Sequence, residues 1–215
     1  IELTSLENGV NFDLDNNNFA EKTAWIGTDD GFLALDRNGN GKIDNGGELF
    51  GDQVILSDGS KSESGFEAIT ELDKNCDGII DHKDSDFVNL RVWIDSNHNG
   101  VSESHELTTL TDLSIDSISL DVTSEENIDT ETGTMEAEYS MVTFTDGSQR
   151  KISEFWFPVN SSDTTHEGTV TSGNVPNIMQ AIKDDESGKL FELCYKFSES
   201  TDIAFKRYYL KQILY

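Results

Sequence analysis

Apolar residues recur at helical spacing in two short segments of the first half of the chain. In residues 64–72, Phe66, Ile69 and Leu72 lie three positions apart, which places them on one face of a helix. Residues 86–94 show the same kind of spacing. The pattern therefore predicts one short helix in each segment.

Later in the chain the pattern changes to the alternation of apolar and polar residues that is typical of β-strands. Ile118, Leu120 and Val122 alternate with polar residues, and so do the apolar residues of segment 135–141. An Asp-Gly pair at residues 146–147 is typical of a hairpin turn. This part of the sequence therefore predicts antiparallel strands.

Two further predictions concern an acidic segment and the C-terminal part of the chain. The acidic composition of residues 123–133 predicts a mobile loop. Near the C-terminus, helical spacing of apolar residues predicts three helices, at residues 175–183, 189–197 and 202–214.

The chain carries far more acid than base. Its 215 residues include 15 Lys and Arg against 42 Asp and Glu, so the formal net charge is −27. Such a polyanion repels phosphate groups, which argues against nucleic acid and anionic membrane surfaces as partners. No apolar run reaches the roughly 18 residues of a membrane span, and the N-terminus lacks the layout of a signal peptide. Because the sequence begins with Ile1 rather than Met, we expect a piece of a longer polypeptide.

The acidic residues are concentrated in segments that repeat one spacing. Residues 73–84 read DKNCDGIIDHKD, which puts Gly78 at position 6, where a sharp turn needs a positive φ. Oxygen ligands are predicted at positions 1, 3, 5, 7, 9 and 12, with the backbone carbonyl serving at position 7: Asp73, Asn75, Asp77, Ile79, Asp81 and Asp84. The spacing predicts a calcium loop of the EF-hand type.

Two other segments repeat this arrangement. Residues 95–106 fill every position: Asp95, Asn97, Asn99, Val101 by its carbonyl, Glu103 and Glu106. Residues 36–48 offer a similar set: Asp36, Asn38, Asn40, Lys42 by its carbonyl, Asp44 and Glu48. In the latter, Gly47 occupies position 12, so we expect closure by Glu48 in slightly altered geometry. The 22-residue offset between the starts of the 73–84 and 95–106 loops predicts that these two form a pair around one shared helix.

A fourth segment contains only the beginning of the pattern. Its predicted ligands are Asp13, Asp15, Asn17 and the carbonyl of Phe19. Asn18 replaces the glycine, and asparagine tolerates a left-handed conformation. Ala24 at position 12 offers no ligand, so Asp29 or Asp30 would have to close the loop after a bend. Whether this loop binds an ion stays open.

The identity of the ion follows from the ligand types. Asp, Asn and Gly are also the residues of solvated turns, so one such segment would be a weak indication; three repeats favour metal binding. Hard oxygen ligands without His or Cys argue against zinc, copper and iron, and magnesium prefers to keep its own waters. We therefore predict Ca²⁺, bound tightest by the 73–84 loop with its four acids. Because the acids repel one another, calcium binding and folding should be coupled.

Together these patterns predict an α+β fold. It would consist of EF-hand-like calcium loops with short helices, an antiparallel β-hairpin region and a C-terminal helical segment. The expected boundaries are a calcium-binding region at 1–112, a β-rich region at 113–160 and a helical region at 161–215, with one compact unit as the alternative.

Three segments resemble the calcium-binding self-processing modules of RTX-type secreted bacterial proteins, such as the iron-regulated RTX proteins: AWIGTDDGFLALDRNGNGKIDNGGELFGD, ELDKNCDGIIDHKDSDFVNLRVWIDSNHNGVSESHEL and TLTDLSIDSISL. The resemblance covers about residues 12–122. It implies secretion as an unfolded chain and calcium-driven folding outside the cell. It also implies autocatalytic cleavage of an upstream Asp-Pro bond, in which the aspartate side chain attacks its own carbonyl and the activated acyl group can pass to a lysine amine as an isopeptide.

This chemistry has no catalytic residue in the present chain. Its two prolines follow Phe157 and Val175, so it contains no Asp-Pro bond, and by the family's layout the scissile bond would precede Ile1. The four histidines are scattered, and no G-x-S-x-G motif is present. Two hypotheses therefore remain: a calcium-folded self-processing module, whose partner would be another protein joined by the isopeptide, or a structural calcium-binding spacer or partner-binding module of a secreted adhesin or toxin.

Overall fold

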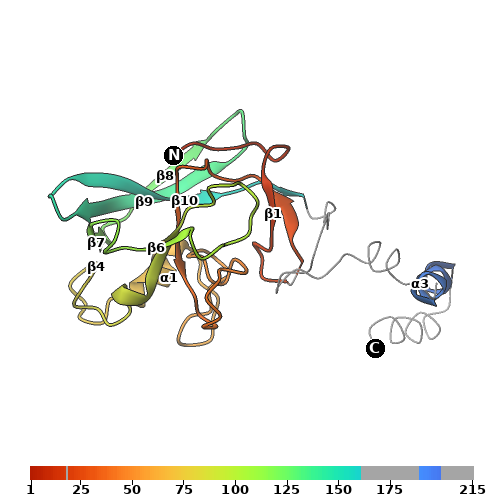
Figure 1. Cartoon of the computed structure of the whole chain (residues 1–215), viewed down its shortest axis with the longest axis horizontal. Coiled ribbons are helices and arrows are strands. Elements are labelled where there is room, and N and C mark those ends of the chain that lie inside the picture. The colour runs from red at the N-terminus through yellow and green to blue at the C-terminus, as the bar shows by residue number, and fades with distance from the viewer. Residues whose placement is uncertain (18, 161–188, 200–215) are drawn as a thin grey trace.

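The protein is described by a computed structural model for residues 1–17, 19–160 and 189–199, and these residues are mostly β-sheet (Figure 1). The helices among them are short: α1 (Gly65–Thr70), the 3-10 turn η1 (Phe87–Asn89) and α3 (Lys189–Glu199). The predicted α+β fold with EF-hand-like loops is therefore wrong. In the described part of the chain, no acidic loop lies between two α-helices, as an EF-hand would require.

The strands form three antiparallel sheets. One contains β1 (Val10–Phe12), β2 (Glu21–Thr23) and β11 (Val159–Asn160), in the order β1-β2-β11. A second contains β3 (Phe32–Leu35), β5 (Leu90–Trp93) and β6 (Leu107–Thr109), in the order β3-β5-β6. The third has the order β10-β9-β7-β4, with β8 also paired to β9: β4 (Ile79–Asp81), β7 (Ile115–Ser119), β8 (Thr123–Ile128), β9 (Met135–Phe144) and β10 (Gln149–Trp156).

The predicted strands of the second half are present. β9 and β10 form a hairpin around residues 146–147, where Gly147 adopts the positive φ of 81° that the turn needs. The prediction of a loop at residues 123–133 is wrong in its first half, because β8 pairs with β9 there. All six residues of β8 are exposed, so no buried apolar face signalled this strand in the sequence.

The first half of the chain contains one predicted helix and lacks the other. α1 begins after Ser64, whose side chain accepts the backbone N–H of Glu67 at 3.1 Å as an N-cap. Residues 86–94 form η1 and β5 instead of a helix. β5 pairs with β3 in the register that sets Phe32 opposite Trp93, a long-range contact that overrides the local helical spacing.

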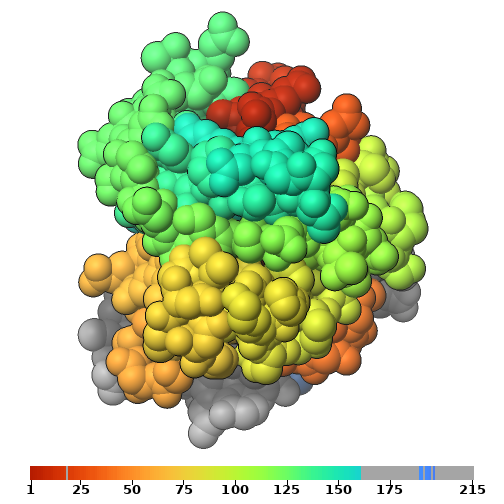
Figure 2. Space-filling view, turned by 90° about the vertical axis from the view of Figure 1, so that its left-hand side faces the viewer, coloured from red at the N-terminus to blue at the C-terminus, as the bar shows by residue number. Residues whose placement is uncertain are grey.

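The core has two clusters of buried residues. One packs α1 against the five-stranded sheet, with Ile69, Ile80, Leu90 and Ile118 almost fully buried. In Figure 2 the green and cyan residues of the second half lie directly against the yellow residues of the segment that includes β4. Because β4 pairs with β7, the acidic-loop region and the β-rich region share a sheet.

The second cluster is aromatic. Trp25 and Trp93 are both fully buried, with ring centroids 5.6 Å apart in an edge-to-face arrangement, and Phe12 lies within 5.4 Å of each. Aromatic pairs of this geometry contribute about 0.5–1.5 kcal/mol each beyond their burial. This cluster lies between the first and second sheets and supports the acidic loops.

At the C-terminal end, the helix predicted at residues 189–197 is confirmed as α3. The helices predicted at 175–183 and 202–214 lie outside the described residues. No helix in the described ranges is long and apolar enough to cross a membrane.

Candidate metal centre

Each acidic loop begins with an aspartate that accepts backbone N–H groups from the middle of its own loop. We name the loops by their first residue: loop 13 (13–21), loop 36 (36–48), loop 73 (73–84) and loop 95 (95–106). The fifth residue donates to the first in all four: Asn17 to Asp13 at 2.9 Å, Asn40 to Asp36 at 3.2 Å, Asp77 to Asp73 at 3.2 Å and Asn99 to Asp95 at 3.0 Å. The sixth residue does so in three: Gly41 to Asp36 at 2.7 Å, Gly78 to Asp73 at 3.0 Å and Gly100 to Asp95 at 2.9 Å.

Three loops are closed by a carboxylate that accepts the N–H groups of the second and ninth residues. In loop 73, Asp84 accepts the N–H groups of Lys74 at 2.9 Å and Asp81 at 3.0 Å. In loop 95, Glu106 accepts those of Ser96 at 2.8 Å and Glu103 at 3.3 Å. In loop 36, Glu48 accepts those of Arg37 at 3.1 Å and Asp44 at 2.9 Å. Glu48, one residue late in sequence, thus accepts the same two N–H groups as the closing residues of the other loops. Loop 36 therefore accommodates one extra residue before Glu48, and its closing hydrogen bonds match those of the other two loops.

Left-handed backbone recurs at two positions of the loops. Position 6 has positive φ in Gly41, Gly78 and Gly100, as the sequence predicted. Position 4 has it as well, in Asn16, Gly39, Cys76 and His98. Positive φ is uncommon outside glycine, although asparagine and histidine adopt it more readily than other residue types, so Cys76 is the unexpected residue at this position. The shared conformation shows that loops 36, 73 and 95 follow one backbone path, and loop 13 shares the left-handed residue at position 4.

The other predicted ligand residues lie close together within each turn. The side chain at position 5 accepts the N–H of position 7 in every loop: Phe19 to Asn17 at 2.8 Å, Lys42 to Asn40 at 2.9 Å, Ile79 to Asp77 at 3.2 Å and Val101 to Asn99 at 2.7 Å. The amides at positions 3 and 5 contact the carboxylate at position 9 in two loops: Asn38 and Asn40 with Asp44, and Asn97 and Asn99 with Glu103. In loop 73 the amide of Asn75 contacts Asp77 instead.

Loop 73 contains a positive charge that the sequence analysis overlooked. The ammonium of Lys83 lies 2.8 Å from Asp81 and 3.3 Å from Asp77. Lys83 thereby neutralises part of the charge of the loop with the most acids. The prediction that this loop binds calcium most tightly counts only its acidic residues and does not include the positive charge of Lys83.

Loop 13 is completed by a residue that the sequence analysis did not select. Asp13, Asp15 and Glu21 bring carboxylate oxygens within 4.8 Å of one another, and Asp13 and Glu21 are buried. Asp30, one of the two expected closing residues, accepts the backbone N–H of Glu2 instead. Glu21 stands at position 9 of this loop, the acidic position of the other three, and that spacing could have identified it.

Glu21 therefore offers a direct test of the fourth loop. We expect Glu21→Gln to reduce the number of bound calcium ions by one, because the substitution removes one of three converging carboxylates. Isothermal calorimetry in calcium measures the stoichiometry. Exposed Glu126, on β8 away from the loops, provides Glu126→Gln as the matched control, and an unchanged stoichiometry in Glu21→Gln would exclude loop 13 as a site.

Several of these carboxylates are buried without a cation from the protein. Asp84, Asp95, Glu48 and Glu106 are each at most 3% exposed. Burying a charge is costly unless it is paired. No Lys, Arg or His in the described ranges forms an ion pair with any of these four.

Burial raises the pKa of two of these loop carboxylates, whereas hydrogen bonds lower the pKa of a third. Burial raises the pKa of Glu48, and it also raises the pKa of Glu21, with the charge of Asp15 acting in the same direction. In Glu106, burial acts to raise the pKa, but hydrogen bonds from Glu103 and Ser96 outweigh it and lower the pKa. The donor set is made of hard oxygens in excess of cations, which fits Ca²⁺.

Two loops are joined at their eighth residues. The Ser102 hydroxyl of loop 95 accepts the N–H of Ile43 in loop 36 at 2.7 Å and donates to the Ile43 carbonyl at 3.1 Å. The predicted pairing of loops 73 and 95 around a shared helix is therefore wrong. Ile80, the eighth residue of loop 73, instead pairs with Ile118 in the five-stranded sheet.

Loop 95 is also anchored to the aromatic cluster. The indole Nε1 of Trp25 donates to the Asp95 carboxylate at 2.9 Å, and both side chains are buried. A loop ligand is thus held by a core residue 70 positions away in sequence. A change at this carboxylate would be transmitted directly to the core.

Comparisons with known proteins show a family relationship. A family model described as the SPM domain matches residues 1–158. The chain is 43% identical over 146 residues to "Iron-regulated protein FrpA" of Neisseria meningitidis serogroup C. That alignment covers 68% of this chain and 13% of FrpA, so the chain spans only a small part of the length of this relative.

Proposed function

Because this chain belongs to the SPM domain family, we propose that it is the calcium-dependent folding module of a larger, secreted RTX-like protein. The observation that supports the proposal most strongly is the common frame of loops 36, 73 and 95. In each, the first carboxylate accepts the N–H groups of positions 5 and 6, and the closing carboxylate accepts those of positions 2 and 9. Unrelated surface turns would not share these bonds in three places.

Calcium would contribute stability by binding only the folded loops. An ion at 100 times its dissociation constant stabilises the folded state by about 2.7 kcal/mol, so three such sites contribute about 8 kcal/mol. That is comparable with the whole stability of a typical domain, about 5–15 kcal/mol. The chain would therefore leave the producing cell extended and fold in extracellular calcium.

The module would also carry the family's self-processing reaction. In that reaction the side-chain carboxylate of an aspartate before a proline attacks its own backbone carbonyl, the bond to the proline nitrogen breaks, and that nitrogen takes up a proton. The acyl group then passes to water or to a lysine amine of a partner protein. The calcium-folded body would hold the upstream Asp-Pro segment in place, because the chain itself contains no such bond.

The processing proposal predicts a cut that depends on calcium. We expect a polypeptide that extends this chain upstream through the proposed Asp-Pro bond to give two fragments in millimolar calcium and one band in chelator. Denaturing gel electrophoresis with mass spectrometry identifies the new ends. Asn in place of the scissile aspartate is the control and should abolish the cut.

The second candidate function is a structural calcium-dependent spacer or partner-binding module. The link between loop 95 and the buried Trp25 favours a structural role for calcium even without processing. An uncut extended polypeptide that still binds calcium would support this function and exclude self-processing.

A further inference from the structure

The N-terminal segment, residues 2–12, is paired with the rest of the chain at both of its ends. At its start, Thr4 donates its N–H to the Trp25 carbonyl at 2.8 Å, and the Thr4 hydroxyl accepts the N–H of Trp25 at 3.0 Å. At its end, β1 pairs with β2. The turn at residues 5–8 lies between these two pairings.

Loop 95 contacts this turn through the histidine at its fourth position. The ring Nε2 of His98 lies 2.9 Å from the carbonyl oxygen of Asn8, a residue 90 positions away in sequence. Because a carbonyl oxygen can only accept a hydrogen bond, Nε2 carries the proton and donates it. Gly100 also packs closely against the segment, since a Cβ at this position would lie 2.7 Å from the carbonyl oxygen of Asn11. Loop 95 therefore contacts the N-terminal segment at two points.

The same loop also holds the residue that pairs with the start of the segment. Asp95 accepts the indole Nε1 of Trp25 at 2.9 Å, and the backbone of Trp25 pairs with Thr4. Two side chains of one loop, Asp95 and His98, thus act on the start and on the turn of the N-terminal segment.

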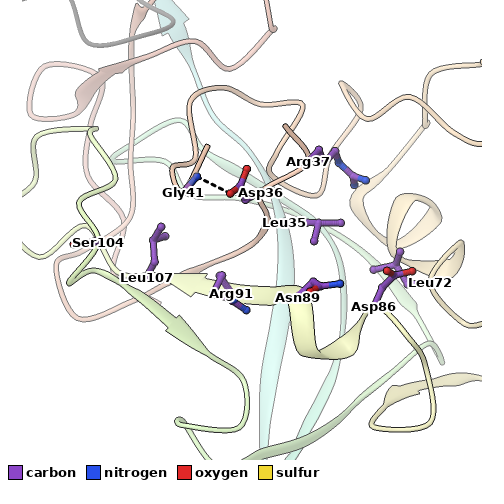
Figure 3. A pocket seen from close by; sticks show the side chains of 10 residues that line it. All are labelled: Leu35, Asp36, Arg37, Gly41, Leu72, Asp86, Asn89, Arg91, Ser104 and Leu107. Atoms are coloured by element: carbon purple, nitrogen blue, oxygen red, sulfur yellow. Dashed lines mark hydrogen bonds between the residues drawn. The ribbon is translucent and has the colours of Figure 1, made fainter. Parts of the chain in front are cut away.

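The backbone of loop 95 sets the direction of the His98 ring. His98 has a φ of 58° and stands between two predicted calcium ligands. The N–H groups that follow it turn back to Asp95, as Figure 3 shows for loop 36, where Asp36 accepts the N–H of Gly41. Calcium neutralises the acids of the loop, whose mutual repulsion otherwise opposes this backbone path.

We propose that loop 95 is a calcium-dependent clamp on the N-terminal segment, and that His98 is a positioning residue for the self-processing reaction. This inference rests on the function proposed above, in which the scissile bond lies upstream of Ile1. The ion holds the loop, the His98 ring holds the turn, and Asp95 holds Trp25 beside Thr4. The chain upstream is thereby kept near the folded body only when calcium is bound, and a reacting bond that is held in place reacts faster than a mobile one.

The test replaces the His98 ring with two amides of different reach. His98→Asn suits the left-handed backbone, but its shorter side chain does not reach the Asn8 carbonyl. His98→Gln offers an amide N–H near the position of the ring Nε2 and should restore the bond. His105→Asn, at an exposed histidine of the same loop, is the matched control.

Each variant is measured in saturating calcium by two methods. Hydrogen exchange with mass spectrometry follows residues 1–12 of the full chain, with β9 as the reference for global stability. Gel electrophoresis follows the rate of the cut in the polypeptide extended upstream through the proposed Asp-Pro bond. Calorimetry checks that every variant binds the same number of calcium ions.

We expect His98→Asn to speed exchange in the N-terminal segment about fivefold and to slow the cut by a similar factor, the size of one lost hydrogen bond. Exchange in β9 should stay unchanged, which separates a local clamp from a general loss of stability. His98→Gln should restore both rates, and His105→Asn should match the unaltered chain.

Each other outcome overturns a defined part of the proposal. Unchanged exchange in His98→Asn, or equal impairment of the Asn and Gln variants, would overturn the clamp. Faster exchange with an unchanged rate of cutting would overturn the link to processing. If the unaltered extended chain binds calcium but is not cut, the proposed processing is refuted, and the exchange rates alone decide whether the clamp exists.

Discussion

Replacing Asp95 with alanine is expected to lower the free energy of unfolding in saturating calcium by about 4 kcal/mol or more, because each buried donor left without a partner costs about 1–3 kcal/mol. Asp95 is 2% exposed and accepts two buried donors, Trp25 Nε1 and the N–H group of Gly100, as well as the N–H group of the exposed Asn99. The loss of the calcium ligand adds to this cost. Urea unfolding followed by tryptophan fluorescence measures the change.

The matched variant for this prediction is Asp36→Ala. Asp36 stands at the same position in loop 36, but its donors Gly39, Asn40 and Gly41 are exposed, so water replaces the lost acceptor. We expect this variant to lose about 2–3 kcal/mol, mainly the contribution of one bound ion. Equal destabilisation by the two variants would contradict the structural role of the contact between Asp95 and Trp25.

The second large effect is expected for Glu48→Gln. Glu48 is 3% exposed, and its two oxygens accept N–H groups from opposite sides of loop 36. The amide removes the negative charge and turns a donor toward one of these N–H groups. We predict that loop 36 binds calcium about 100-fold more weakly, a loss of about 2.7 kcal/mol.

Calorimetric titration with calcium detects this loss as one high-affinity site fewer. The charge-matched control is again Glu126→Gln, whose side chain is exposed on β8, and its titration should match that of the unaltered chain. If Glu48→Gln and the control bind the same number of ions with the same affinities, Glu48 does not close the loop.

The loops were predictable from sequence because their geometry is local. Glycine at position 6 and oxygen side chains two residues apart fix the turn, and the structure has positive φ at Gly41, Gly78 and Gly100 as expected. The one-residue delay of Glu48 was also visible in the spacing. The positive φ of Cys76 was hidden, since cysteine does not favour that conformation, whereas histidine, present at position 98, adopts it more readily than most residue types.

The fold was not predictable in the same way, because its decisive contacts are far apart in sequence. Residues 86–94 have apolar side chains at spacings that suit a helix, but β5 is held by pairing with β3 and β6. All side chains of β8 are exposed, so this strand is held by its backbone pairing with β9 rather than by buried apolar side chains. The prediction of which loops pair was wrong for the same reason. Loop 95 contacts loop 36 through Ser102 and Ile43, which are 59 positions apart, whereas the 22-residue offset suggested loop 73 as its partner.

The central claim is that calcium, by neutralising the buried carboxylates of the loops, allows this polyanionic chain to fold. The most direct measurement is thermal unfolding followed by circular dichroism, in calcium at about 100 times the dissociation constant of the loops and in excess chelator. The account predicts one cooperative transition with calcium and a largely unfolded spectrum with no transition in chelator. Identical spectra and melting curves under the two conditions would contradict it.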